Sequence, residues 1–180
     1  MENSKRNTLA KDKIEFVSSI ITNEQGNVAI FKRRKDLKLD PGKYDFCSGH
    51  MKDGEVPMQS MYRELNEEIG LKPEQIKYME QIGIIGTPHK KFLDNTLSHI
   101  YHVRINLTQE ELNQMIKSVE EPEMDEVLYL KDIEQVRKEM QKENSQMRMI
   151  YTKQMKYALD AIEQRINKRK EQKKELCEEK

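Results

Sequence analysis

The sequence has no tryptophan, only two cysteines and no excess of either charge sign across its 180 residues. Cys47 and Cys177 are far apart, so they predict no disulfide framework and indicate a reducing compartment. Basic and acidic residues both number 32, which excludes a chain-wide basic charge for binding nucleic acid. No run of 18 apolar residues predicts a membrane span, and the first residues lack the apolar segment typical of a secretory signal. We therefore expect a cytoplasmic protein with no membrane partner, and nucleic acid is disfavoured as a partner.

The basic residues are concentrated towards the end of the sequence. Residues 137–180 contain 13 basic and 8 acidic side chains, a local net charge of +5. Apolar residues recur there at steps of three and four, which predicts one amphipathic helix. These apolar positions are Tyr151, Met155, Ala158, Leu159, Ile162 and Ile166. We divide the chain into a domain of residues 1–136 and a C-terminal amphipathic helix with a polar tail, residues 137–180.

The apolar stripe of that helix has two alternative places to pack. It can dock on the preceding domain or pair with a second copy in a homodimer, and its short length favours the preceding domain. Beyond Ile166 almost nothing is left to bury, so we expect the last residues to fray into solvent. A basic group lies in this stretch, namely Lys168, Arg169, Lys170, Lys173 and Lys174. Such charge runs are usually solvated, and contact with a phosphate-rich partner is the alternative.

Residues 14–105 show patterns typical of strands and turns. Apolar-rich runs at 14–22 and 28–33 flank the turn sequence NEQGN, which predicts an antiparallel hairpin. Two later runs predict a second antiparallel pair joined by a loop, and two shorter strands complete the set. These later runs cover residues 78–86, 97–106, 44–48 and 126–130. Thr108 and Asp132 are typical helix caps, so a helix is predicted after each, and the fold class is α+β.

Three glutamates fall at a spacing that brings them together. A helix over residues 57–69 is predicted by a proline at its first position and by Gly70 just past its end. Glu64, Glu67 and Glu68 then share one face, where their charges repel unless a cation offsets them. Mg²⁺ or Mn²⁺ suits such closely spaced oxygen ligands, whereas the simpler alternative is an ordinary acidic helix face.

The spacing of the whole segment resembles the Nudix box. Gly49 is followed after five residues by Glu55, and after seven more by the sequence RELNEEIGL, which begins at Arg63. Every defining position of the box is present. The resemblance extends more loosely over residues 14–135 and implies a Nudix-type α/β/α sandwich with a mixed sheet. It also implies metal-dependent hydrolysis of a nucleoside diphosphate linked to another moiety.

The resemblance implies roles for single residues as well. Glu64, Glu67 and Glu68 correspond to metal ligands, together with the carbonyl of Ser48, and Mg²⁺ or Mn²⁺ is the implied cofactor. Glu64 and Glu67 are also the implied catalytic carboxylates of the box, and Glu123 is favoured as a base outside it. The other candidates for that base are Glu121, Asp125 and Glu126. The residues implied to support the box structurally are Gly49, Glu55, Arg63 and Gly70.

Substrate contacts are less well specified. Tyr44 or Phe46 can stack on a base, and each can equally be a core aromatic. Arg33 can steer phosphates, and a solvated surface role is the alternative. The candidate substrates are nucleoside triphosphates, dinucleoside polyphosphates, nucleotide alarmones and phosphosugar diphosphates.

The residues that precede the box suggest two other functions. The sequence Ser48-Gly49-His50 is similar to the start of the box in isopentenyl-diphosphate isomerase, where a cysteine stands directly before the Gly-His pair. Here Cys47 is one residue earlier, so on a strand it is expected to point to the opposite face. The intact glutamates favour a hydrolase over an isomerase. A nucleotide-binding or regulatory Nudix module without catalysis is the remaining alternative.

Overall fold

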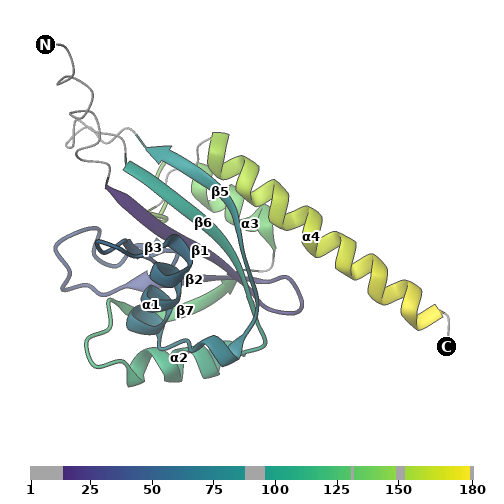
Figure 1. The fold of residues 1–180 in the computed structure, drawn as a ribbon, viewed down its shortest axis with the longest axis horizontal. Helices are drawn as coiled ribbons and strands as arrows, with labels where there is room; N and C mark the ends of the chain where they lie inside the picture. The colour runs from purple at the N-terminus through teal and green to yellow at the C-terminus, as the bar shows by residue number, and fades with distance from the viewer. Residues whose placement is uncertain (1–13, 88–95, 131, 149–152, 179–180) are drawn as a thin grey trace, which may run out of the picture.

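A mixed seven-stranded sheet forms the centre of the molecule in the computed structural model, which describes residues 14–87, 96–130, 132–148 and 153–178 (Figure 1). The strands are β1 (Glu15–Thr22), β2 (Val28–Arg33), β3 (Tyr44–Asp45), β4 (Ser48–His50), β5 (Ile76–Thr87), β6 (Thr96–Ile105) and β7 (Met124–Leu130). The strand order is β3-β2-β1-β6-β5, with β4 paired to β1 and β7 paired to β2. β1 and β6 run parallel, and the other pairs are antiparallel.

Both predicted antiparallel pairs are confirmed, as β1–β2 and β5–β6. In the first turn, Asn23 Oδ1 accepts hydrogen bonds from the N–H groups of Gln25 and Asn27 at 3.1 and 2.9 Å. The single strand predicted at 44–48 is wrong, because β3 pairs with β2 whereas β4 pairs with β1. Most of the loop predicted between β5 and β6 lies outside the described residues.

Two helices begin at the predicted caps, Thr108 and Asp132. The helices are α1 (Pro57–Ile69), α2 (Gln109–Ser118), α3 (Ile133–Gln141) and α4 (Lys153–Glu178), with a 3₁₀ turn at Pro73–Gln75. Thr108 Oγ1 accepts the N–H of Glu111 at 3.2 Å, and Asp132 Oδ1 accepts the N–H of Gln135 at 2.8 Å. Each cap therefore satisfies one of the N–H groups left free in a first helical turn.

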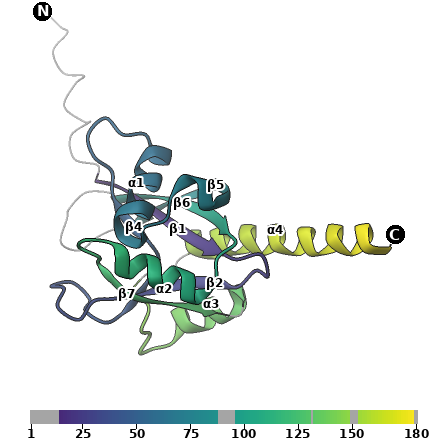
Figure 2. The same ribbon diagram turned by 90° about the horizontal axis from the view of Figure 1, so that it is seen from below.

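The predicted fraying after Ile166 is wrong, because α4 continues to Glu178. The residues beyond Ile166 are mostly lysine, arginine, glutamate and glutamine, which favour helix even without burial. The guanidinium of Arg169 also lies 5.2 Å from the ring centre of Tyr78 on β5, a cation–π contact that ties this part of α4 to the sheet. Figure 2 shows the end of α4 projecting beyond the rest of the molecule.

Helices cover both faces of the sheet (Figures 1 and 2). Alternate residues of β2 belong to two separate core clusters, with Ala29 and Phe31 in one and Val28 and Ile30 in the other. The first core cluster contains buried residues of α1 and α2, and the second contains buried residues of α3 and α4. A strand buried on both faces has a continuous apolar run, as β2 has from Val28 to Phe31. The predicted α/β/α sandwich is confirmed.

The apolar stripe of α4 packs on its own chain, as favoured from the sequence. Met155, Ala158, Leu159 and Ile162 are at most 1% exposed and belong to the second core cluster. The division of the chain at residue 137 stays a prediction, and it falls inside α3. Within the described ranges, no helix combines the length and the apolar character that crossing a membrane requires.

Candidate active site

The box helix α1 is fixed at both ends by local signals. The N–H of Val56 donates to the side-chain oxygen of Gln59 at 3.4 Å just before the first turn. At the other end Gly70 has φ 72°, in the left-handed region that favours glycine. The N–H of Gly70 donates to the carbonyl of Asn66, and that of Leu71 to the carbonyl of Leu65, both at 3.0 Å. This arrangement closes the helix at the predicted residue.

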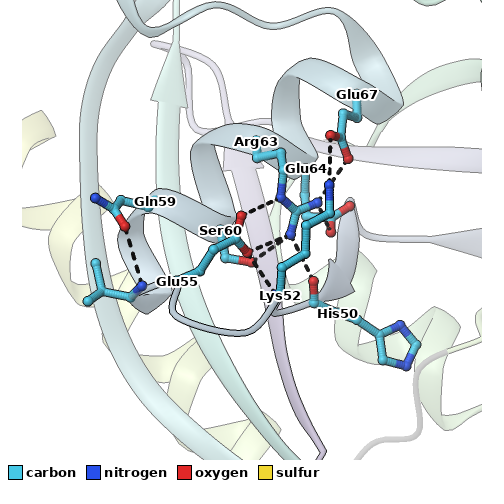
Figure 3. A network of polar contacts seen from close by, with 9 residues as sticks. His50, Lys52, Glu55, Gln59, Ser60, Arg63, Glu64 and Glu67 are labelled. Carbon is cyan, nitrogen blue, oxygen red and sulfur yellow. Dashed lines mark hydrogen bonds and ion pairs between the residues drawn. The ribbon is translucent and has the colours of Figure 1, made fainter.

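Arg63 lies at the centre of a network of polar contacts (Figure 3). Its Nε and Nη2 donate to the two oxygens of Glu55 at 2.6 and 2.8 Å, which makes a forked pair between two of the residues implied to support the box. Nη2 also donates to the carbonyl of His50 at 2.8 Å and to Ser60 Oγ at 3.1 Å. Arg63 therefore joins the loop before α1 to the helix itself. Hydrogen bonds from Arg63 lower the pKa of Glu55 to about 2.

The same guanidinium contacts two of the three box glutamates. Arg63 Nη1 lies 2.6 Å from Glu64 Oε1 and 2.9 Å from Glu67 Oε2. Lys52 Nζ lies 3.4 Å from the other oxygen of Glu67. Lys52 was not predicted as a site residue, since the spacing of the box defines only the length of the loop that holds it. Two basic side chains thus offset the repulsion that the sequence led us to expect.

Glu68 lies in a different environment from Glu67. The carboxyl group of Glu68 is buried, its Oε2 accepts the N–H of Ser48 at 3.0 Å, and no lysine or arginine of the described residues contacts it. Burial raises the pKa of Glu68 to about 8, and the charges of Glu64 and Glu123 act in the same direction. By contrast, the side chain of Glu67 is 49% exposed. In the box, the Glu67 carboxylate is therefore accessible to solvent, whereas the Glu68 carboxyl group is buried.

Gly49 is required by the close approach of Glu64. A Cβ atom built on Gly49 would lie 2.0 Å from the carboxyl carbon of Glu64 and 2.1 to 2.2 Å from its two oxygens. The buried Glu64 carboxyl group thus occupies the space that any other side chain at position 49 would need. Burial also raises the pKa of Glu64, and the hydrogen bond from Arg63 opposes this effect.

Glu123, the predicted base outside the box, lies near these glutamates. It precedes β7, its side chain is 52% exposed, and it accepts a hydrogen bond from Arg33 Nη1 at 3.2 Å. It is close enough for its charge to raise the pKa of Glu68. Arg33 itself is buried, and its Nε donates to the carbonyl of Leu39 at 3.3 Å. In this structure Arg33 positions Glu123. A contact between Arg33 and a substrate stays a prediction.

The two predicted stacking aromatics differ in their surroundings. Phe46 is 0% exposed within the second core cluster, so the prediction that a base stacks on it is wrong for this structure. It matches the alternative of a core aromatic. Tyr44 is only partly buried at the edge of the same cluster, and its contact with a base stays a prediction.

Cys47 lies on the face of the sheet that α1 covers, opposite to its neighbour Phe46 and on the same side as Gly49. The thiol is fully buried in the first core cluster beside α1, where it forms a hydrogen bond with Glu68. Burial, followed by the charge of Glu68, raises the pKa of the Cys47 thiol well above its ordinary value. Phe46 belongs to the second core cluster and Cys47 to the first, so side chains alternate between the two faces here although both residues lie between β3 and β4.

The carboxylates do not form a ready metal site in the part of the chain that the structure describes. No group of three or more His, Cys, Asp or Glu side chains there is arranged to hold an ion. The physical reason is that Arg63 and Lys52 already bind the oxygens of Glu64 and Glu67. The donor set nevertheless fits a hard divalent cation, since it consists of oxygens and includes the buried Glu68, which lacks a cationic partner among the described residues.

Comparison with known sequences shows the family. A sequence model of the NUDIX domain matches residues 15–150. A stretch of 63 residues is 44% identical to an RNA pyrophosphohydrolase of Aeromonas hydrophila, covering 35% of this chain and 33% of that protein. A stretch of 70 residues is 33% identical to the 8-oxo-dGTP diphosphatase of Escherichia coli, covering 39% of this chain and 54% of that protein. The matches thus span from a third to about half of the length of these relatives.

Comparison with solved structures shows the fold. The MutT protein of Methanosarcina mazei Go1 has a TM-score of 0.57 at 16% identity, over 88% of this chain and 98% of that one. A NUDIX hydrolase of Nitrosomonas europaea has a TM-score of 0.56 at 15% identity, over 84% of this chain and 91% of that one. Because the domain match covers most of the sequence and the observed sheet agrees with it, this chain belongs to the Nudix family.

Proposed function

We propose that this protein is a divalent-metal-dependent pyrophosphohydrolase that cleaves the pyrophosphate linkage of a nucleotide. The observation that carries the proposal is the network around Arg63, which holds Glu55, Glu64 and Glu67 on one side of α1. The names of the relatives support a nucleotide substrate, since one is an RNA pyrophosphohydrolase and another an 8-oxo-dGTP diphosphatase.

In this proposal Glu64, Glu67, Glu68 and the Ser48 carbonyl hold Mg²⁺ or Mn²⁺. The cation supplies charge for the phosphate oxygens and lowers the pKa of a water that it binds. Glu67 is the ligand whose contacts must change, because it has to release Lys52 and one nitrogen of Arg63. Arg63 keeps its fork to Glu55, so the loop and the helix stay joined while Glu67 reorients.

Glu123 is the proposed proton acceptor. As water attacks phosphorus, a new P–O bond forms, the anhydride P–O bond breaks, and the proton of the water passes to the Glu123 carboxylate. Its exposed position before β7 gives access to solvent, and Arg33 fixes the direction of its carboxyl group. A positioned base of this kind contributes about 100-fold or more to the rate.

Cys47 favours a hydrolase over an isomerase. An isomerase that uses a cysteine needs the thiol to reach the substrate, but Cys47 is 0% exposed and sealed between the sheet and α1. Its raised pKa also keeps it in the neutral thiol form.

The test is a panel of phosphate-release reactions with Mg²⁺ or Mn²⁺. The panel contains nucleoside triphosphates, a dinucleoside polyphosphate and a short 5′-triphosphorylated RNA, with isopentenyl diphosphate as the isomerase control. We expect Glu67→Gln to lower kcat by roughly 100-fold or more and Glu123→Gln to lower it by about 100-fold. Glu120→Gln is the matched control, because Glu120 is exposed and outside the site, and it should retain wild-type turnover.

Two outcomes would refute the proposal. If Glu67→Gln keeps near-full turnover, the box glutamates do not perform the reaction. If no substrate of the panel is hydrolysed but a nucleotide binds tightly, the protein is a nucleotide-binding Nudix module without catalysis.

A further inference from the structure

A basic cavity lies between α4 and the sheet, on the face opposite α1. Its volume is about 160 Å³, and residues of the β1–β2 turn, β6 and α4 line it. Glu24 is the one acidic residue among the described residues that line it. The basic lining residues are Arg104, Arg165, Arg169, Lys170 and Lys173.

Two buried nitrogens of the lining residues have no hydrogen-bond partner among the described residues. One is Nε of Arg104 on β6, and the other is Nδ1 of His102, a residue that is only 3% exposed. The second ring nitrogen of His102 lies 2.9 Å from Thr22 Oγ1, so the ring orientation is fixed. Buried polar nitrogens almost always have partners in folded proteins. Their presence beside a cavity indicates a ligand that completes their hydrogen bonds.

Most of the cations at this cavity are not neutralised by the protein. Arg165 donates to Glu80 at 2.9 Å, and Arg169 lies over the ring of Tyr78. No ion pair involves Arg104, Arg169 or either lysine within the described ranges. Positive charges gathered in this way repel one another, so an anion between them would relieve the repulsion.

The β1–β2 turn packs closely against α4, and this packing sets the shape of the cavity. Gly26 in the β1–β2 turn has φ +87°, and a Cβ atom built there would lie 2.8 Å from Cγ2 of Ile166. The turn therefore lies directly against α4 and fixes the distance between the helix and β6. Figure 1 shows this turn extending from the sheet towards the middle of α4.

We propose that this cavity binds a small phosphate anion, inorganic phosphate or pyrophosphate, at a site separate from the box. None of the described lining residues is Phe, Tyr or Trp, so the cavity offers charged groups and hydrogen-bond donors rather than a large aromatic face for a nucleobase. The volume corresponds to about five water molecules, which suits one or two phosphoryl groups. Arginine and lysine side chains bind phosphate oxygens through charge-assisted hydrogen bonds. The proposal does not depend on the proposed hydrolase activity.

The test is isothermal titration calorimetry of the full chain with sodium pyrophosphate and, separately, inorganic phosphate. EDTA is present and the buffer contains no phosphate or sulfate, so that a metal-dependent site in the box is inactive. We expect saturable one-site binding, with affinity lowered about tenfold or more by Arg104→Gln and by Arg169→Gln. Lys168→Gln removes the same charge from an exposed position of α4 outside the cavity, and should change the affinity less than about twofold.

Arg104→Lys is a second variant in case Arg104→Gln destabilises the fold. It keeps the charge and removes Nε, so it should also weaken binding, with the fold checked by circular dichroism. Absence of binding by both anions would overturn the proposal, as would equal losses in Lys168→Gln and Arg169→Gln. Binding of a short 5′-phosphorylated RNA without binding of either small anion would also overturn it, in favour of a nucleic-acid surface.

Discussion

The variant Gly49→Ala tests whether the close packing of Gly49 against Glu64 is needed for the stability of the protein. A Cβ atom there would lie 2.0 Å from the carboxyl carbon of Glu64, whereas carbon atoms in contact are about 3.5 Å apart or more. The Glu64 carboxyl group would have to move by roughly 1.5 Å, away from its contact with Arg63. Overpacking of this kind lowers the free energy of unfolding by about 1–3 kcal/mol. For a domain of this size, that lowers the Tm of Gly49→Ala by roughly 2–12 °C.

The assay is urea unfolding followed by circular dichroism, together with phosphate release. Gly83→Ala is the matched control, because a Cβ at Gly83 meets nothing within 4 Å. In the Glu64→Ala background the colliding carboxyl group is gone, so the added methyl should no longer reduce stability, although activity should not return. The reasoning is refuted if the methyl reduces stability equally in both backgrounds or leaves the wild-type protein unaffected.

Two further predictions concern the face of the sheet that α4 covers. Leu159→Ala should lower the free energy of unfolding by about 2–5 kcal/mol, because Leu159 is fully buried, while exposed Tyr157→Ala should have little effect. Equal effects in urea unfolding would contradict the packing of α4. Burial, with the charges of Arg165 and Arg169, lowers the pKa of His102 to about 4. The free energy of unfolding therefore includes a contribution from neutral His102 that is complete above pH 6.5 and is lost as the pH falls towards 4. The loss is about 3 kcal/mol in total. The variant His102→Asn should lack this part of the pH dependence of unfolding.

The starts of α1, α2 and α3 and the end of α1 could be predicted because their signals are local. The box helix was expected over residues 57–69 and runs from Pro57 to Ile69. Its end depends on Gly70, whose left-handed conformation lets two N–H groups reach back to carbonyls of the last turn. Thr108 and Asp132 act in the same way at two helix starts. All of these contacts join residues within six positions of each other, so the sequence pattern contains them.

The surroundings of the glutamates could not be predicted in this way. Cys47 lies beside Glu68 because α1 packs on this face of the sheet, which no pattern within residues 44–50 reveals. The ion pair between Lys52 and Glu67 depends on the path of the loop that precedes α1. The continuation of α4 depends in part on the contact of Arg169 with Tyr78, some ninety positions earlier in the chain. Each of these is a long-range contact without a periodic signal.

The sheet keeps two opposite charge environments apart. The glutamates of α1 lie over the first core cluster, whereas the basic residues of α4 line a cavity on the side of the second. β1 lies between them, and its buried residues alternate between the two clusters. The basic residues of α4 that line the cavity are therefore held apart from the site where a negatively charged substrate is proposed to bind. It follows that Arg169→Gln should alter anion binding without altering metal-dependent turnover, and that Gly49→Ala should do the reverse.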